Sequence, residues 1–255
     1  RRLFNQGQIL GADGERMSKS RGNVQDPDEL VSRYGADSVR LFLMFMGPWD
    51  QGGPWSPTGI EGVHRFLRRV WAVVLDPTGS ESDGSTVDVV DGERQVRVAA
   101  HRALQGVTED HAGFRWNTIV AKLMELTNTL MRYRGTEAAS SAGWDEASRL
   151  LLLMLAPVAP HIADELWSRR LTAAGEPWRS IHTEAWPAVD PAQLVSDEIE
   201  LPVQVNGKLR DLVTMAAGLS QAEIEAIVLA QPKVRANLEG KQVVKVIHVG
   251  GKLVN

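Results

Sequence analysis

The sequence predicts a mainly α protein in which an antiparallel helix bundle follows a shorter mixed segment and precedes a small α+β domain. Apolar residues recur at helical spacing from about 58 to 174, a glycine-rich stretch with turn signals fills 1–57, and apolar residues alternate with period two beyond Asp197. We therefore expect three domains, 1–57, 58–190 and 198–255. The 255 residues, 43% hydrophobic and 24% charged, have the composition of a globular protein.

The composition also excludes several classes of protein. The absence of cysteine rules out disulfides, thiolate zinc sites and cysteine nucleophiles. The longest apolar run, 150–160, is shorter than the roughly 20 residues that a membrane-spanning helix needs, and the start of the chain lacks the apolar region of a signal peptide. We therefore expect a cytoplasmic protein with no membrane contact. The net charge of −4 gives no overall basic surface for nucleic acid.

In the first segment, an Asp26-Pro27 cap predicts a helix from Pro27 to Tyr34, because aspartate accepts from free helix N–H groups and proline suits the first turn. The next run, 39–46, is hydrophobic almost all round and predicts a helix buried on every side, which Pro48 ends.

The central segment predicts a bundle. Apolar spacing from Val63 to Val74 indicates one helix, a Ser/Gly/Asp-rich linker spans 76–87, and further helices are expected at about 92–111, 115–134, 144–156 and 159–173. A proline-stiffened strap over 176–197 is expected to cover them and lead into a linker. Four tryptophans lie on apolar helical faces, which favours a core role over base stacking: Trp71, Trp116, Trp144 and Trp167.

The last segment predicts a β-hairpin around Asn206-Gly207, with strands 199–205 and 209–215. Ser220 and Glu223 form a capping-box pattern for a helix through Ala230, and 243–249 reads as a further strand. From Lys208 onward the chain carries seven basic and four acidic residues, so any contact of this segment with a polyanion is local.

The loop from Arg16 to Asn23 concentrates cations, hydroxyls and glycine. A lysine ammonium, serine hydroxyls and close backbone approach at glycine are the groups that hold a polyphosphate and stabilise a phosphoryl or nucleotidyl transition state. Residue types alone do not decide between this role and an ordinary solvated loop.

This loop resembles the KMSKS signature of class I aminoacyl-tRNA synthetases. The flanks are similar to those of the leucine, isoleucine, valine and methionine enzymes, and the run 155–167 is similar to a helix break in the anticodon-binding domain of that group. The residues that carry the resemblance are Met17-Ser18-Lys19-Ser20, Arg21-Gly22-Asn23, Asp26-Pro27, Tyr34-Gly35-Ala36-Asp37, Arg40-Leu41-Phe42 and Leu155-Ala156-Pro157-Val158-Ala159-Pro160-His161 through Trp167.

The tail narrows the resemblance to the bacterial leucyl-tRNA synthetase family. Residues 201–210 and 245–249 are similar to the C-terminal domain of that family, and Gly47-Pro48-Trp49 and His64-Arg65-Phe66-Leu67 agree with it. The resemblance implies the end of a Rossmann-type catalytic domain, an anticodon-binding-type bundle and a small tRNA-contacting domain. It also implies a fragment that is inactive alone, because the HIGH signature and the editing domain would lie upstream.

For the site, the resemblance implies that Lys19 stabilises the pyrophosphate leaving group of ATP, which arrives with Mg²⁺. The implied ATP-binding set is Arg16, Met17, Ser18, Lys19 and Ser20. Arg16 stands where the family usually has lysine, so a planar guanidinium replaces a compact ammonium and the positive charge is kept. Met17 is favoured as a packing anchor, and Asn23 as either a loop support or a plain turn residue.

The resemblance implies tRNA-Leu as a partner. It also implies that ATP and leucine bind together with the upstream half of the catalytic domain. A monomer is expected. Eight basic residues are candidates for tRNA binding, and the alternative for each is that it is only a solvated surface charge. They are Arg65, Arg68, Arg69, Lys208, Arg210, Lys233, Arg235 and Lys245. The six histidines lack metal-ligand spacing, so no bound metal is expected, and His161 is favoured as a structural group. Two alternatives stay open: another aliphatic class I synthetase, or a stand-alone synthetase-derived tRNA-binding module.

Overall fold

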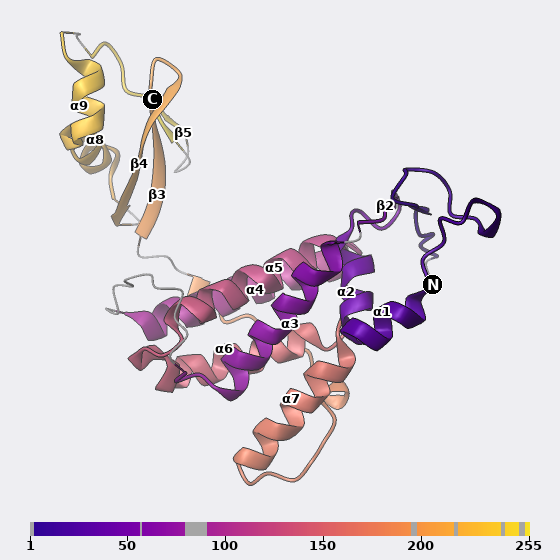
Figure 1. Ribbon diagram of the computed structural model, residues 1–255. Helices are drawn as coiled ribbons and strands as arrows, with labels where there is room; N and C mark the ends of the chain where they lie inside the picture. Colours follow the sequence, from indigo (N-terminus) through magenta and orange to yellow (C-terminus); the bar gives the residue numbers. More distant parts are fainter. Residues whose placement is uncertain are drawn as a thin grey trace. The chain divides into compact units, whose positions relative to one another are not determined.

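The computed structural model describes residues 3–56, 58–79, 91–194, 198–216, 219–240, 243–249 and 253–255. It forms two compact units, Arg1–Asp190 and Pro191–Asn255 (Figure 1). The first is mainly helical and the second combines a sheet with two helices, which confirms the mainly α class with a small α+β part. The first unit ends at Asp190, where the expected segment 58–190 ends. The expected boundary at residue 57 lies within the first unit and stays a prediction.

The first unit begins with a small parallel pair of strands, β1 (Ile9–Leu10) and β2 (Gly53–Pro54). Their close pairing requires glycine at position 52. Gly52 has φ +67°, and a Cβ added there would lie 2.1 Å from the Gln8 carbonyl oxygen. Helices α1 (Pro27–Tyr34) and α2 (Ala36–Phe45) lie between the strands in the sequence.

Helix α1 begins at Pro27 as predicted, because the Asp26 carboxylate accepts from the Asp28 amide at 2.9 Å. The expectation that the following helix is buried on every side was wrong. Leu41 and Phe42 are buried in α2, but Arg40 is exposed and Phe45 is 40% exposed, so one side of this apolar helix faces outward.

The bundle consists of α3 (Gly59–Leu75), α4 (Gly92–Ala112), α5 (Trp116–Tyr133), α6 (Ala142–Leu155) and α7 (Pro160–Ala173), close to the predicted ranges. Figure 1 shows α4 and α5 side by side. Helix α6 is the most enclosed, since every residue from Leu150 to Leu155 is buried. The predicted linker 76–87 is described only through Gly79, and its remainder lies outside the described residues.

The tryptophans divide into core and surface residues. Trp144 and Trp167 are each 4% exposed, and the Trp144 indole donates to the Val73 carbonyl at 3.2 Å. Trp116 is half-buried against the core. The core prediction was wrong for Trp71, which is 37% exposed and has only the Arg169 side chain of α7 described over its ring.

The strap over the bundle is confirmed for its first part. Ile181, in the short helix η3 (Ile181–Thr183), is buried, and its amide donates to the Asp164 carboxylate at 2.9 Å. The Trp186 indole donates to Thr108 at 3.0 Å, and the Asp190 amide to His101 Nδ1 at 3.1 Å. These bonds place residues up to 190 in the first unit.

An aromatic cluster joins the start of the chain to the turn between α4 and α5. Phe114, at φ +57°, stacks on Phe4 with ring centroids 4.1 Å apart and meets Trp116 edge-on. His111 lies edge-on to Trp116 and Trp186, and burial lowers its pKa because the imidazolium loses hydration there.

The second unit is a four-stranded sheet in the order β4-β3-β6-β5 with helices α8 and α9. The hairpin of β3 (Glu198–Val205) and β4 (Lys208–Ala216) turns at Asn206-Gly207, and α8 (Gln221–Ala230) has the predicted Ser220–Glu223 capping box. The predicted strand 243–249 is reduced to β5 (His248–Val249). Helix α9 (Pro232–Leu238) and strand β6 (Leu253–Val254) were not predicted from the sequence. In the described part of the chain, no helix is long and apolar enough to span a membrane.

Candidate functional site

The cation-rich loop lies between β1 and α1. Its entry is a turn in which the Gly11 amide donates to the Glu15 carbonyl at 2.7 Å and the Gly14 amide to the Gly11 carbonyl at 2.9 Å. The loop ends in a short helix, η1 (Lys19–Arg21), which Gly22 closes at φ +68°. This geometry brings the loop back toward its start before α1 begins.

Asn23 fixes the loop through its side-chain amide. Its oxygen accepts from the Ser18 amide at 2.9 Å, and its nitrogen donates to the Asp13 carboxylate at 3.1 Å and to the Arg16 carbonyl at 3.3 Å. The Glu15 amide also donates to Asp13, and this bond, with a further contribution from Asn23, lowers the pKa of the Asp13 carboxyl. Asn23 is therefore a loop support rather than a plain turn residue.

The charged ends of the loop are available to a ligand. Lys19 and Arg16 are exposed, and their side chains make no hydrogen bond or ion pair with any residue that the structure describes. Arg21 differs, because Glu15 accepts from it at 2.9 Å. The Ser18 and Ser20 hydroxyls lie 3.2 Å apart, and Met17 packs against the hydrophobic core as the sequence favoured. An ammonium, a guanidinium and two hydroxyls on an anchored backbone can hold a polyphosphate.

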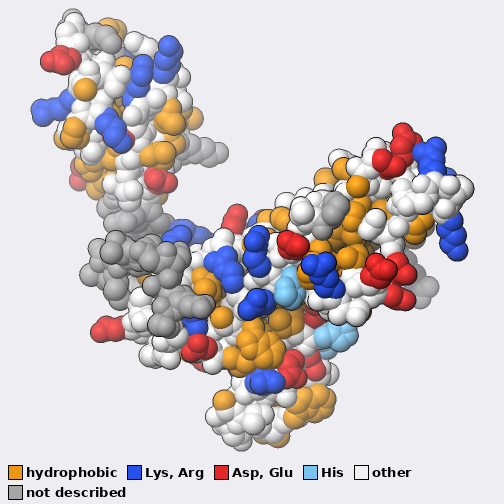
Figure 2. Space-filling view, in the orientation of Figure 1, with side chains coloured by type: hydrophobic (Ala, Val, Ile, Leu, Met, Phe, Trp, Pro, Cys, Tyr) orange, Lys and Arg blue, Asp and Glu red, His pale blue; other side chains and the backbone are white. Residues whose placement is uncertain are grey.

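Helix α3 carries the next group of predicted residues. Arg65 and Arg68 are exposed and Arg69 is half-buried, while Phe66 and Leu67 are buried on the opposite side of the helix. Within the described ranges, none of the three arginines has an ion-pair partner. Figure 2 shows basic side chains gathered beside histidines on this part of the molecule. The sequence therefore placed these three cations together correctly on one face.

The predicted residues of the second unit lie on three elements. Lys208 and Arg210 are on β4, Lys233 and Arg235 on α9, and Lys245 follows them, and all five are exposed. The Lys233 ammonium is already paired with the Asp211 carboxylate at 3.0 Å. The other four have no ion-pair partner among the residues described for this unit.

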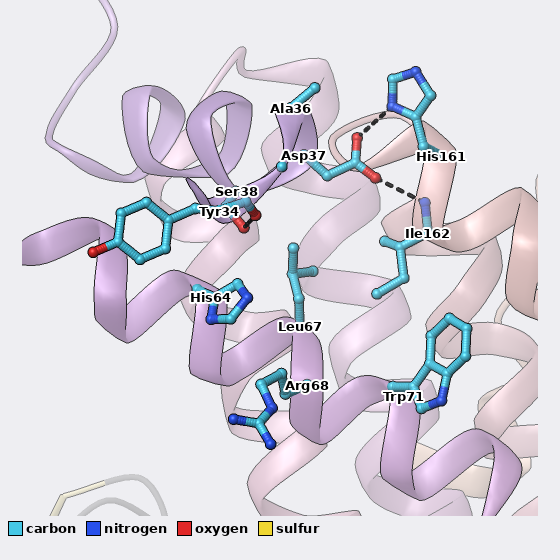
Figure 3. Close-up of a pocket in the computed structure, with 11 residues that line it drawn as sticks. Tyr34, Ala36, Asp37, Ser38, His64, Leu67, Arg68, Trp71, His161 and Ile162 are labelled. Carbon is cyan, nitrogen blue, oxygen red and sulfur yellow. Dashed lines mark hydrogen bonds and ion pairs between the residues drawn. The ribbon is translucent and has the colours of Figure 1, made fainter. Parts of the chain in front are cut away.

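A buried carboxylate that sequence reasoning missed connects α2 to α7. Asp37 is 6% exposed and accepts from the Ile162 amide at 2.7 Å and from His161 Nδ1 at 2.9 Å (Figure 3). Ala159 precedes α7 and has no side-chain oxygen to cap it, so Asp37 performs that role from another helix. His161 thus has the structural bond expected of it.

These residues border a cavity of about 380 Å³ between α1, α2, α3 and α7. Its lining includes Tyr34, His64, Leu67, Arg68 and Trp71 from the first part of the unit, with His161 and Ile162 from α7. Where side chains are described, no group of three potential metal ligands occurs.

Comparison with known proteins identifies the family. Residues 93–227 match the family described as the anticodon-binding domain of tRNA ligase, and residues 1–51 match class I tRNA synthetases for isoleucine, leucine, methionine and valine. The first match covers more than half of the chain. The chain belongs to this tRNA ligase family.

Relatives of this tRNA ligase chain are named leucine–tRNA ligase. It is 48% identical to the ligase of Herpetosiphon aurantiacus over 257 residues and 46% identical to that of Deinococcus radiodurans over 256 residues. All of the chain aligns in both comparisons, but it spans only about 30% of the length of each relative. A solved ternary complex of an Agrobacterium radiobacter K84 LeuRS with tRNA and LeuAMS is similar, with a TM-score of 0.78 and 30% identity, over 99% of this chain and 33% of that one.

Proposed function

We propose that this chain forms part of a leucine–tRNA ligase, in which it supplies the loop that acts on ATP and surfaces that bind tRNA-Leu. The observation that carries the proposal is the alignment of the whole chain with bacterial leucine–tRNA ligases at 40–48% identity. The exposed cations Arg16 and Lys19 of the loop and Arg65 and Arg68 of α3 supply groups suited to both roles.

In leucine activation, the amino-acid carboxylate attacks the α-phosphorus of ATP and pyrophosphate leaves. Negative charge grows on the leaving group in the transition state, and the mobile ammonium of Lys19 is suited to stabilise it. Arg16 adds a planar donor, and the Ser18 and Ser20 hydroxyls add neutral ones. Mg²⁺ accompanies ATP as part of the substrate. Because Asn23 and Asp13 hold the loop backbone, they reduce the reorganisation required when ATP binds.

For tRNA, phosphate contacts by arginine and lysine provide most of the affinity and position the ligand. Arg65, Arg68 and Arg69 are proposed to contact the tRNA backbone from the first unit. Lys208, Arg210, Arg235 and Lys245 are proposed to do so from the second. Lys233 joins this set as a weaker member, because contact with phosphate competes with its Asp211 ion pair. A cytoplasmic, monomeric enzyme is part of the same proposal.

The test separates the two roles within the complete ligase that contains this chain. Lys19→Ala is expected to reduce leucine-dependent ATP–pyrophosphate exchange while tRNA-Leu still binds. Combined alanine substitution of Lys208, Arg210, Arg235 and Lys245 is expected to reduce tRNA charging while exchange continues. Arg102→Ala on α4 is a matched control, because Arg102 is also exposed and lies outside both sets. Normal exchange in the first variant and normal charging in the second would overturn the proposal.

A further inference from the structure

The cavity beside α3 has the features of a binding site for one nucleotide. Its volume of about 380 Å³ is within the range of small-ligand pockets, and Leu67 and Ile162 give it an apolar interior. Figure 3 shows these two side chains between the Trp71 indole and the Asp37 carboxylate. Trp71 and His64 contribute aromatic faces to the same lining.

The tryptophan is exposed but held in place. Trp71 is 37% exposed, and the Arg169 guanidinium lies 5.0 Å from its ring centroid. Arg169 is itself held by the Glu165 carboxylate, which accepts at 2.7 Å. An aromatic ring that is already braced loses little conformational entropy when a flat ligand stacks on it, so this arrangement favours binding.

The charge around the cavity favours an anionic ligand. Asp37 is the carboxylate among the lining residues, and both of its oxygens are engaged by α7. Arg68 lines the cavity and has no ion-pair partner within the described part of the chain. A ligand with a flat π system and an attached phosphate matches this combination of groups.

We propose that this cavity binds a single unstacked nucleotide of RNA, with its base on Trp71 and its phosphate on Arg68. The proposal rests on the proposed tRNA binding and deepens it, because it assigns a base-binding subsite where that proposal assigns only backbone contact. Double-stranded RNA keeps its bases stacked, so it reaches the arginines but not the tryptophan.

The experiment compares an unstructured RNA oligonucleotide of about 12 nucleotides, a length within the usual single-strand site sizes, with its perfect duplex. Binding to the full 255-residue chain is followed by fluorescence polarisation over a series of salt concentrations. Trp71→Ala is expected to raise the Kd for the single strand by about 5- to 100-fold and to leave the duplex Kd unchanged. Trp71→Phe, which keeps a π face, is expected to recover most of the affinity.

Arg68→Ala is expected to weaken both RNAs and to lower the salt slope by roughly one unit. The matched controls are Trp178→Ala, which removes a tryptophan that is 67% exposed elsewhere in the unit, and Arg102→Ala; neither is expected to change binding. An unchanged single-strand Kd in Trp71→Ala, an equal loss for the duplex, or displacement of the RNA by an acidic peptide in wild type but not in Trp71→Ala would overturn the proposal. If any of these three results is found while tRNA-Leu still binds, only the nucleotide site is refuted and the proposed function stands. If the wild-type chain binds no RNA at all, the proposed function is refuted as well.

Discussion

Removing the Asp37 carboxylate is expected to destabilise the first unit because Asp37 caps α7 from α2. In Asp37→Ala, the Ile162 N–H loses the acceptor that lies at 2.7 Å, and His161 Nδ1 loses its partner at 2.9 Å. A donor left without an acceptor where water has little access costs about 1–3 kcal/mol, and the Ile162 amide is partly buried. The His161 bond adds little, because its side chain is 74% exposed and water replaces the carboxylate. The expected loss is about 1–3 kcal/mol of unfolding free energy.

Urea unfolding followed by tryptophan fluorescence measures this loss in the correct unit, because all eight tryptophans precede Pro191. Asp37→Asn, which keeps one acceptor oxygen, is expected to lose about 1 kcal/mol. Asp145→Ala is the matched control: its carboxylate pairs with Arg170 but is 71% exposed, so a change below about 0.5 kcal/mol is expected. Hydrogen exchange at the Ile162 amide supplies the local readout. If Asp37→Ala costs less than about 0.5 kcal/mol and leaves that amide protected, the capping argument is refuted.

Three further predictions concern activity, charge and pH. Lys19→Ala in the complete ligase is expected to slow single-turnover adenylate formation by ~10²–10³ while leucine affinity barely changes, because the ammonium acts mainly in the transition state; a rate within tenfold of wild type would contradict this. In salt titrations of tRNA-Leu binding, Arg210→Ala is expected to lower the salt slope more than Lys233→Ala, because Lys233 is already paired with Asp211; equal effects would refute this ranking. Burial lowers the pKa of His111 in the folded protein. As the pH falls through the ordinary histidine value, the His111 imidazole is therefore protonated in the unfolded chain before it is protonated in the folded one, and the free energy of unfolding decreases. His111→Phe is expected to lose less stability than wild type between pH 7.5 and about 5.5 in urea unfolding, and an identical loss in both proteins would contradict this.

Local signals in the sequence predicted most of the helices. The Asp26-Pro27 start and the Ser220–Glu223 capping box act within one turn of the chain, so their geometry follows from neighbouring residues. The hairpin at Asn206-Gly207 was predicted for the same reason, because the turn itself requires positive φ at both positions.

The errors arose where tertiary contacts decide the outcome. Trp71 has the apolar helical spacing of a core residue, but the sequence does not show that the neighbouring elements leave its indole 37% exposed. Residues 243–247 are rich in β-branched side chains, but only Ile247 among them pairs in the manner of a strand residue, by exchanging backbone hydrogen bonds with Asn255, and the regular strand is His248–Val249. Propensity describes how well a side chain fits a sheet and does not provide a neighbouring strand.

The candidate site was predictable in part. The motif around Lys19 placed the loop cations correctly, and helical spacing placed Arg65, Arg68 and Arg69 on one face. The role of Asp37 depends on its bond to the distant Ile162, and the residue types alone gave no signal for it. For Asn23, the sequence left loop support and a plain turn residue open, and the bonds to Ser18 and Asp13 decide between them. The Asp13-Gly14 turn before the motif was the one available indication that a polar side chain could return to the loop.

The central claim is that this chain binds tRNA as part of a leucine–tRNA ligase, and a titration of tRNA-Leu into the folded 255-residue chain tests it most directly. The account predicts saturable binding whose logarithmic affinity falls linearly with logarithmic salt concentration, with a shallower slope when Arg65, Arg68 and Arg69 are replaced together by alanine. Absence of binding at low salt, or affinity that does not change with salt, would contradict it.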